Sequence, residues 1–155
     1  MRLHASVALL TGLCLTASCL GTTEPTPAPD CSAFALAYPT ATDLVTTPSG
    51  LQYRDVVVGT GASVTAGGTV VTYYSACLTT GETFSQVSAP SRFVFSVGTG
   101  SVPAGLDEGV QGMKLGGRRQ LVIPAALGYG TSGSPGGFPV PNSTFVMTVD
   151  AVGLR

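Results

Sequence analysis

The chain has 155 residues, enough for one globular domain and a short additional segment. Only 10% of the residues are charged and the formal net charge is −1. This excludes a nucleic-acid binder that relies on a basic surface, and also a charge-driven disordered chain. The single histidine is His4, so a chain that loses its N-terminus has no imidazole. Ser-His and Cys-His nucleophilic catalysis and a histidine-ligated zinc site are then excluded.

The N-terminus has the pattern of an export signal. Arg2 is followed by an apolar stretch, residues 5–15, that is too short to span a bilayer comfortably. Small residues then precede Cys19, which resembles a bacterial lipoprotein signal. In that reading residues 1–18 are removed and Cys19 becomes the lipidated first residue. An ordinary cleavable signal with an incidental cysteine is the alternative.

Residues 19–46 are predicted to form a Pro/Thr-rich tether and N-terminal extension. The stretch at 22–29 reads TTEPTPAP, which is extended, polar and poor at forming a helix or a strand ladder. A lipid anchor needs such a spacer, and stable anchoring takes more than one acyl chain. The predicted localisation is therefore an exported, membrane-anchored lipoprotein that faces the periplasm or the cell exterior.

Four cysteines have to be accounted for. Cys14 lies in the signal and Cys19 is the candidate lipid site. Cys31 and Cys77 remain as an even pair in a chain predicted to be exported, which favours a disulfide between them. Two buried free thiols are the alternative. No CxxC spacing is present, so the sequence gives no support to thiol–disulfide oxidoreductase chemistry.

The folded part is expected to begin near Thr47 and to consist mainly of strands and turns. β-Rich runs bounded by glycine or proline predict five strands, over residues 51–58, 69–78, 92–97, 118–123 and 144–152. Residues 124–142 are a long Gly/Pro loop without regular structure. A loop of this length in a compact domain is more often functional than idle.

One short helix is predicted between the third and fourth strands. Leu106, Val110 and Met113 lie at i, i+4 and i+7, on one helical face. Gly109 and Gly112 each cost this helix about 1 kcal/mol relative to alanine. We therefore expect that packing, rather than intrinsic propensity, holds the helix in place.

Six short motifs occur in an order and spacing that resemble one protein family. They are VTYY at 71–74, TGETF at 80–84, GLDEGV at 105–110, MKLGG at 113–117, IP at 123–124 with LGYG at 127–130, and VPNST at 140–144. Together they closely resemble the FKBP-type peptidyl-prolyl cis/trans isomerases, and TPSGLQY at 47–53 is similar to the start of bacterial members. The resemblance covers residues 47–155. It implies an α+β fold in which an antiparallel β-sheet curls as a half-barrel around one short α-helix.

In that family the substrate proline enters an apolar pocket lined by aromatic side chains. The resemblance implies three catalytic residues, Tyr74, Phe84 and Tyr129. It implies five substrate-binding residues, Phe93, Val102, Leu106, Phe138 and Met147. Tyr129 is the expected hydroxyl donor, and Leu106 forms the pocket floor where many relatives have tryptophan. Ordinary core packing is the alternative role for these side chains.

The implied reaction suits these residue types. Rotation about a prolyl amide has a barrier of about 18–20 kcal/mol, because resonance gives the C–N bond double-bond character. Water stabilises the planar, polar amide. An apolar pocket removes that water, and the twisted amide, which is less polar, loses less stabilisation than the planar one. Binding the twisted state better than the planar one accelerates rotation, and it needs no nucleophile, metal or cofactor. The expected partners are proline-containing polypeptides and FKBP-binding macrolides, with no nucleic acid.

Several positions depart from the family pattern. The aspartate after the turn phenylalanine is Ser85 here. The position after Val102, whose backbone N–H contacts a ligand carbonyl in relatives, is Pro103, which has no N–H. Residues 139–141 read PVP where relatives have hydrophobic-Pro-Pro, and Ser134 replaces a histidine of some members. These departures favour a weaker catalyst. The alternatives are a non-catalytic module that binds proline-containing segments, and a structural β-domain with an occluded pocket.

Overall fold

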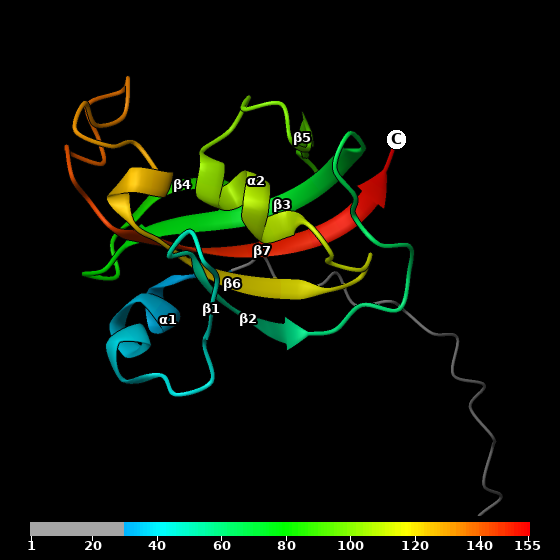
Figure 1. Ribbon diagram of the computed structural model, residues 1–155, viewed down its shortest axis with the longest axis horizontal. Coiled ribbons are helices and arrows are strands. Elements are labelled where there is room, and N and C mark those ends of the chain that lie inside the picture. The colour runs from blue at the N-terminus through cyan, green and yellow to red at the C-terminus, as the bar shows by residue number, and fades with distance from the viewer. Residues whose placement is uncertain (1–29) are drawn as a thin grey trace, which may run out of the picture.

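The computed structural model describes residues 30–155 (Figure 1). Its elements in chain order are α1 (Ser32–Ala37), η1 (Tyr38–Thr40), β1 (Val45–Thr46), β2 (Gln52–Val57), β3 (Thr69–Leu78), β4 (Thr83–Val87), β5 (Phe93–Ser96), α2 (Ala104–Val110), β6 (Arg118–Ile123), η2 (Ala125–Leu127) and β7 (Phe145–Leu154). The predicted signal, the candidate lipid site Cys19 and the TTEPTPAP stretch lie outside the described residues.

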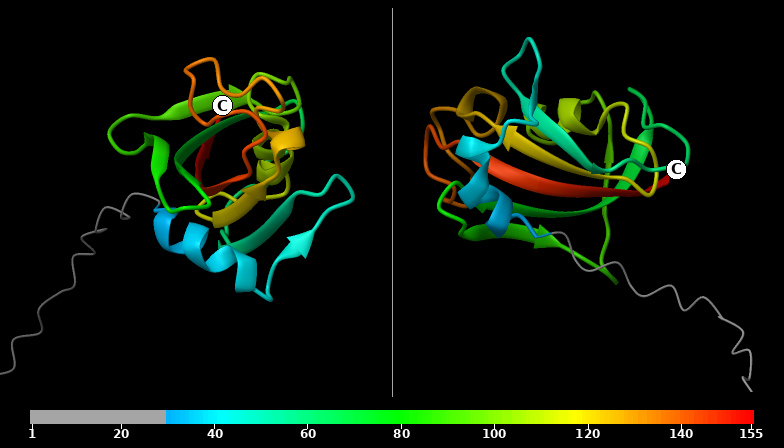
Figure 2. Two further views of the ribbon diagram at one scale, coloured as in Figure 1. Left: turned by 90° about the vertical axis from the view of Figure 1, so that its left-hand side faces the viewer. Right: turned by 90° about the horizontal axis from the view of Figure 1, so that it is seen from below.

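The strands form one antiparallel sheet in the order β1-β2-β6-β7-β3-β4. β3 has three strand partners, because it pairs with β7 on one side and with both β5 and β4 on the other. Its β-branched and aromatic composition suits a strand that is covered on both faces. Figure 2 shows α1 and α2 on opposite faces of this sheet, which curls around α2. The predicted antiparallel half-barrel around one short helix is confirmed.

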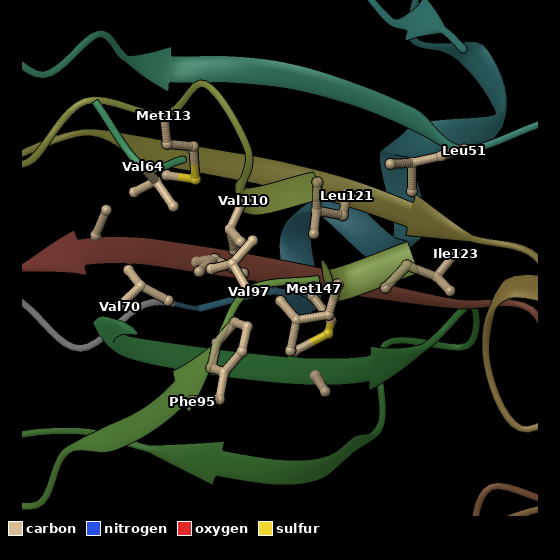
Figure 3. Close-up of a cluster of buried hydrophobic side chains, with 14 of the residues drawn as sticks. Leu51, Val64, Val70, Phe95, Val97, Val110, Met113, Leu121, Ile123 and Met147 are labelled. Carbon is tan, nitrogen blue, oxygen red and sulfur yellow. The ribbon is translucent and has the colours of Figure 1, made fainter. Parts of the chain in front are cut away.

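The concave face of the sheet packs on α2 to form the main core (Figure 3). Leu106 and Val110 of α2 meet Leu121 and Ile123 of β6, and all four are buried. The helix is shorter than predicted, because it ends at Val110. The chain then turns at Gly112, which has a φ of +75°, a conformation that favours glycine. Met113 is buried as predicted, but it reaches the core from this turn and not from the helix.

Small residues allow α2 to lie close to the sheet. A Cβ added at Gly105 would be 2.7 Å from Cγ2 of Ile123, and one added at Gly109 would be 2.7 Å from Cδ1 of Leu121. Ordinary carbon contacts are about 3.5–4.0 Å. Close packing therefore accompanies the helical cost of Gly105 and Gly109, whereas Gly112, which was also predicted to lie in the helix, lies beyond its end at Val110.

Residues 30–44, which we call the strap, lie across the convex face of the sheet and lead into its edge strand β1. Cys31, Phe34 and Ala35 are buried there in a second apolar cluster with Cys77, Val122 and Val146 of the sheet. A disulfide joins Cys31 to Cys77, with their Cα atoms 5.8 Å apart. The predicted disulfide is thus present in the structure.

Polar contacts fix the two ends of the strap. The Thr148 hydroxyl of β7 donates to the Asp30 carbonyl at 3.0 Å. Arg54 of β2 lies over the Phe34 ring at 4.9 Å and forms a 3.0 Å ion pair with Asp43. Folded structure therefore begins before Thr47, where the sequence placed its start. The buried residues of the strap are few, and the tertiary fold brings a partner surface to them.

Other differences concern short elements. β1 and β4 were not predicted, since β1 has two residues and β4 mixes polar and apolar side chains. The long loop after β6 contains the 3-10 turn η2. No helix within residues 30–155 is both long enough and apolar enough to cross a lipid bilayer.

Candidate functional site

An apolar pocket of about 70 Å³ opens between the concave face of the sheet and α2. Its lining residues are Tyr74, Ala76, Phe84, Ser85, Phe93, Pro103, Leu106, Tyr129, Phe145 and Met147. They come from β3, β4, β5, β7, the start of α2 and the loop after η2. None of these lining side chains is charged. Such a cavity suits a small apolar ring with a few polar groups at its edge.

Six of the eight predicted site residues meet in this pocket: Tyr74, Phe84, Phe93, Leu106, Tyr129 and Met147. Phe138 lies at the rim, 39% exposed, with its ring 6.0 Å from that of Phe84. Val102 is partly buried against the core and does not line the pocket. Ala76 and Phe145 were missed. Strand alternation could have identified both, since each lies two residues from a predicted lining residue, Tyr74 or Met147.

Aromatic contacts hold the pocket walls together. Tyr74 and Phe93 pack edge to face with ring centroids 5.1 Å apart. Phe145 is only 1% exposed and lies between two other walls, with its ring centroid 5.4 Å from that of Phe84 and 5.6 Å from that of Tyr129. The Tyr74–Phe93 and Phe84–Phe145 pairs are edge to face, and such pairs add about 0.5–1.5 kcal/mol to the energy of burial. The walls are therefore braced by one another as well as by the sheet.

A β-bulge places two consecutive residues of β4 in the pocket. Ala76 pairs with Ser85, but the next residue of β3, Cys77, pairs with Thr83. Phe84 is thus the extra residue, without a partner on β3. Consecutive side chains of a regular strand point to opposite faces, and the bulge allows Phe84 and Ser85 both to line the pocket.

Both ends of α2, which carries Leu106, are anchored by charged side chains. The Asp107 carboxylate accepts hydrogen bonds from the N–H groups of Gly98, at 2.7 Å, and Gly100, at 3.4 Å. At the other end, Arg119 donates to the carbonyls of Gly109, at 2.9 Å, and Gln111, at 3.2 Å. The two hydrogen bonds from Arg119 satisfy carbonyls at the C-terminal end of α2 that have no partner within the helix.

Arg119 is itself held from the other side. It forms a two-pronged pair with the Asp55 carboxylate of β2, at 2.7 and 3.0 Å. Its guanidinium also lies 4.5 Å from the centre of the Tyr53 ring. The pocket floor is thereby connected to the sheet through a buried arginine. Within residues 30–155, no three His, Cys, Asp or Glu side chains group closely enough to hold a metal ion.

Comparison with known proteins identifies the family to which this site belongs. Residues 61–152 match the model of the family described as FKBP-type peptidyl-prolyl cis-trans isomerase. The chain belongs to this family. The family predicted from the sequence motifs is thereby confirmed.

Curated relatives of this FKBP-type chain differ in length. It is 48% identical over 109 residues to FK506-binding protein 4 of Dictyostelium discoideum. The matched region is 70% of this chain but 29% of that protein. It is 41% identical over 109 residues to the FK506-binding protein of Streptomyces anulatus, covering 69% of this chain and 88% of that one. The chain thus spans less than a third of the first relative and most of the second.

Solved structures share the fold. The crystal structure of AtFKBP13 superposes with a TM-score of 0.66 at 30% identity, covering 72% of this chain and 98% of that one. The crystal structure of FkpA from Escherichia coli gives a TM-score of 0.68 at 31% identity, covering 79% of this chain and 56% of that one. These likenesses agree with the half-barrel described above.

The two main departures from the FKBP pattern lie in the pocket wall. Ser85, in place of aspartate, has its Oγ 2.9 Å from the Tyr74 hydroxyl. The tyrosine therefore keeps a hydrogen-bonding partner, but a neutral one. Pro103 caps α2 with a φ of −50°, and its carbonyl accepts from the N–H groups of Leu106 and Asp107 at 2.9 and 3.0 Å. Its ring lines the pocket, and as a proline it offers no backbone N–H there.

Tyr129 is the polar group available to a ligand. Its hydroxyl makes no hydrogen bond to any residue of the described chain. Burial raises the pKa of this hydroxyl above the ordinary tyrosine value, and the neighbouring Tyr74 raises it further. The Tyr129 hydroxyl therefore keeps its proton at neutral pH and well into the alkaline range. It can donate to a carbonyl oxygen at the edge of the apolar pocket.

Proposed function

We propose that this FKBP-type domain catalyses cis–trans isomerisation of X-Pro bonds in exported polypeptides. The observation that carries the proposal is an uncharged, aromatic-lined pocket with one unpartnered hydroxyl, that of Tyr129. A proline ring would fill the apolar cavity, and the Tyr129 O–H would donate to a carbonyl of the bound peptide. The reacting group would then be the amide itself, with no covalent intermediate.

The pocket would accelerate rotation through the loss of water around the amide. Resonance makes the planar amide the more polar form, so removal from water costs it more than it costs the twisted form. The rings of Phe84, Phe93 and Phe145 supply that dry environment. Interactions that favour the twisted state over the planar one raise the rate. Because Pro103 offers no N–H, one substrate carbonyl would lack a backbone donor. We therefore expect weaker substrate binding.

The proposed localisation is outside the cytoplasm, at a membrane surface. A buried structural disulfide, Cys31–Cys77, suits an oxidising compartment. We propose that residues 1–18 are removed, that Cys19 is lipid-modified, and that 19–46 precedes an isomerase domain at 47–155. Mass spectrometry of the membrane fraction should show an acylated N-terminal peptide. A soluble protein with an unmodified Cys19 thiol would exclude the anchor.

A protease-coupled isomerisation assay on a proline tetrapeptide tests the activity directly. The wild-type chain should accelerate the slow phase, and Phe84→Ala should lose most of the acceleration because it opens the wall to water. Val94→Ala is the matched control, since Val94 is 39% exposed on β5 and does not line the pocket. It should retain wild-type activity. A macrolide of the FK506 type should inhibit by competing for the same pocket.

A non-catalytic module that binds proline-containing segments is the second candidate. Pro103 and Ser85 favour it, because they remove a backbone donor and a carboxylate from the pocket. Titration calorimetry with the same tetrapeptide separates the two functions. Binding without acceleration would replace the isomerase with the binding module, and the absence of both would leave the family and fold without the proposed function.

A further inference from the structure

The strap meets the sheet at the place where the pocket wall is irregular. Cys77, which holds the disulfide to Cys31, is the residue of β3 at which the pairing with β4 changes register. The residue opposite it, Thr83, immediately precedes the bulged Phe84. The cross-link and the bulge are therefore adjacent, on opposite faces of the same strand pair.

Further contacts connect the strap to this strand pair. The Thr83 hydroxyl oxygen lies 3.3 Å from Sγ of Cys77, and the Ser75 hydroxyl oxygen lies 2.8 Å from Sγ of Cys31. Leu36 of α1 lies against the β3–β4 turn, because a Cβ added at Gly81 would be only 3.4 Å from its Cγ. Leu36 is nevertheless 67% exposed. Its apolar side chain thus covers the turn that leads directly into Phe84.

A bulge has no ladder partner for its extra residue, so its geometry depends on what surrounds it. On the concave side Phe84 contacts Phe145 and Phe138. On the convex side the strap packs against this end of β3, through the cluster and the disulfide that it shares with Cys77. The strap also precedes residues 61–152, so it is not part of what the family model matches.

We infer that the strap, locked by the Cys31–Cys77 disulfide, is a positioning element that fixes the β4 bulge and so directs Phe84 into the proline pocket. Cys31, Cys77 and Leu36 do not line the pocket, so they would not contact the substrate. In this proposal they act by positioning Phe84. The inference rests on the proposed function for its kinetic readout, but its structural consequence, the placement of the Phe84 ring, can be measured independently.

A double-mutant cycle tests the inference. The double variant Cys31→Ser/Cys77→Ser removes the cross-link. Its two new hydroxyls can form hydrogen bonds to the hydroxyls that already lie beside the sulfur atoms, Ser75 at position 31 and Thr83 at position 77. In the wild-type background it should lower kcat/KM on the order of tenfold, the scale expected for a misplaced substrate-contacting group. In a Phe84→Ala background the same change should have less than roughly a twofold effect, because the side chain through which the strap acts is absent.

Two further variants separate positioning from general stability. Val122→Ala shortens a buried side chain of the same convex-face cluster, from β6 and away from the bulge. It should lower Tm while leaving kcat/KM unchanged at temperatures well below Tm. Leu36→Ala changes an exposed residue and should not impair folding. It should lower kcat/KM roughly two- to threefold in the wild-type background and not at all in the Phe84→Ala background.

An NMR measurement decides the case without turnover. The nuclear Overhauser contact between the Phe84 and Phe145 rings should weaken in the serine variant and in Leu36→Ala, and persist in Val122→Ala. Equal losses of kcat/KM in both backgrounds, or an unchanged ring contact, would overturn the positioning role. If the wild-type chain shows no isomerase activity, the proposed function fails, while the ring contact and the peptide Kd across the same cycle still decide the inference.

Discussion

Gly105 offers a direct test of how closely α2 must approach the sheet. In Gly105→Ala the new methyl carbon would lie 2.7 Å from Cγ2, 3.0 Å from Cγ1 and 3.3 Å from Cβ of Ile123. These atoms belong to the stiff, branched part of a side chain that is 0% exposed. Either Ile123 or the helix has to move by several tenths of an ångström or more. The change therefore also shifts the neighbouring pocket floor, Leu106.

The expected magnitude follows from two opposing terms. Alanine improves the intrinsic helix propensity by at most about 1 kcal/mol. Overpacking of a closely packed core typically costs about 1–3 kcal/mol. We therefore expect a net loss of about 1–2 kcal/mol in the free energy of unfolding, which corresponds to a fall in Tm of about 4 °C per kcal/mol for a domain of this size.

Urea denaturation followed by circular dichroism measures this loss. Ala104→Gly is the matched control, because this exposed first residue of α2 reports helix propensity without the clash. Ile123→Ala provides the reciprocal test, since it removes the two closest atoms, Cγ2 and Cγ1, and leaves the Cβ at 3.3 Å. In that background Gly105→Ala should be neutral or stabilising. A higher Tm for Gly105→Ala in the otherwise wild-type chain would refute the close-approach reasoning.

Four other predictions concern the pocket and its support. Tyr129→Phe should lower kcat/KM about fivefold, the value of one net hydrogen bond of about 1 kcal/mol. Because burial and Tyr74 raise the pKa of the Tyr129 hydroxyl, wild-type kcat/KM should stay level as the pH passes the ordinary tyrosine value of about 10 and fall only above it; an inflection at the ordinary value would contradict this. Ser85→Asp gives the Tyr74 hydroxyl a charged acceptor and should raise kcat/KM in the tetrapeptide assay, whereas unchanged activity would mean that the serine is no handicap. Arg119→Met removes two hydrogen bonds to the end of α2 and also the ion pair with Asp55, and should lower the free energy of unfolding by about 2–3 kcal/mol in urea titrations; a loss below about 0.5 kcal/mol would show that these contacts together do not stabilise the helix end.

The long strands could be predicted because their residue types and their boundaries agree. Thr69–Leu78 is rich in β-branched and aromatic residues and ends at a Thr-Gly turn, so its predicted bounds match those of β3. β4 lacks that agreement, since its sequence, TFSQV, carries no clear alternation. Its bulge explains why. With Phe84 and Ser85 on the same side, a pattern of period two cannot appear in the sequence.

The candidate site was predictable where a motif fixes the position of a side chain. Tyr74, Phe84 and Tyr129 lie within contiguous motifs, and the structure brings all three to one pocket. Phe138 and Val102 were less well placed, because loop residues acquire their positions from tertiary contacts rather than from a local period. The strap illustrates the same limit, since Cys31 was identified by cysteine pairing, whereas the burial of Phe34 and Ala35 depends on the surface that β3, β6 and β7 provide.

The position of Asp30 has a consequence for how the domain presents itself to other polypeptides. Its carbonyl is bound by Thr148 on the convex face, whereas Tyr74 and Met147 line the pocket from the concave face. The chain therefore enters the domain from behind, with the thickness of the sheet between its point of entry and the proline pocket. Anything attached upstream of Asp30 joins the domain at its back. The anchor proposed for Cys19 would therefore leave the pocket mouth, on the opposite face, free for a polypeptide.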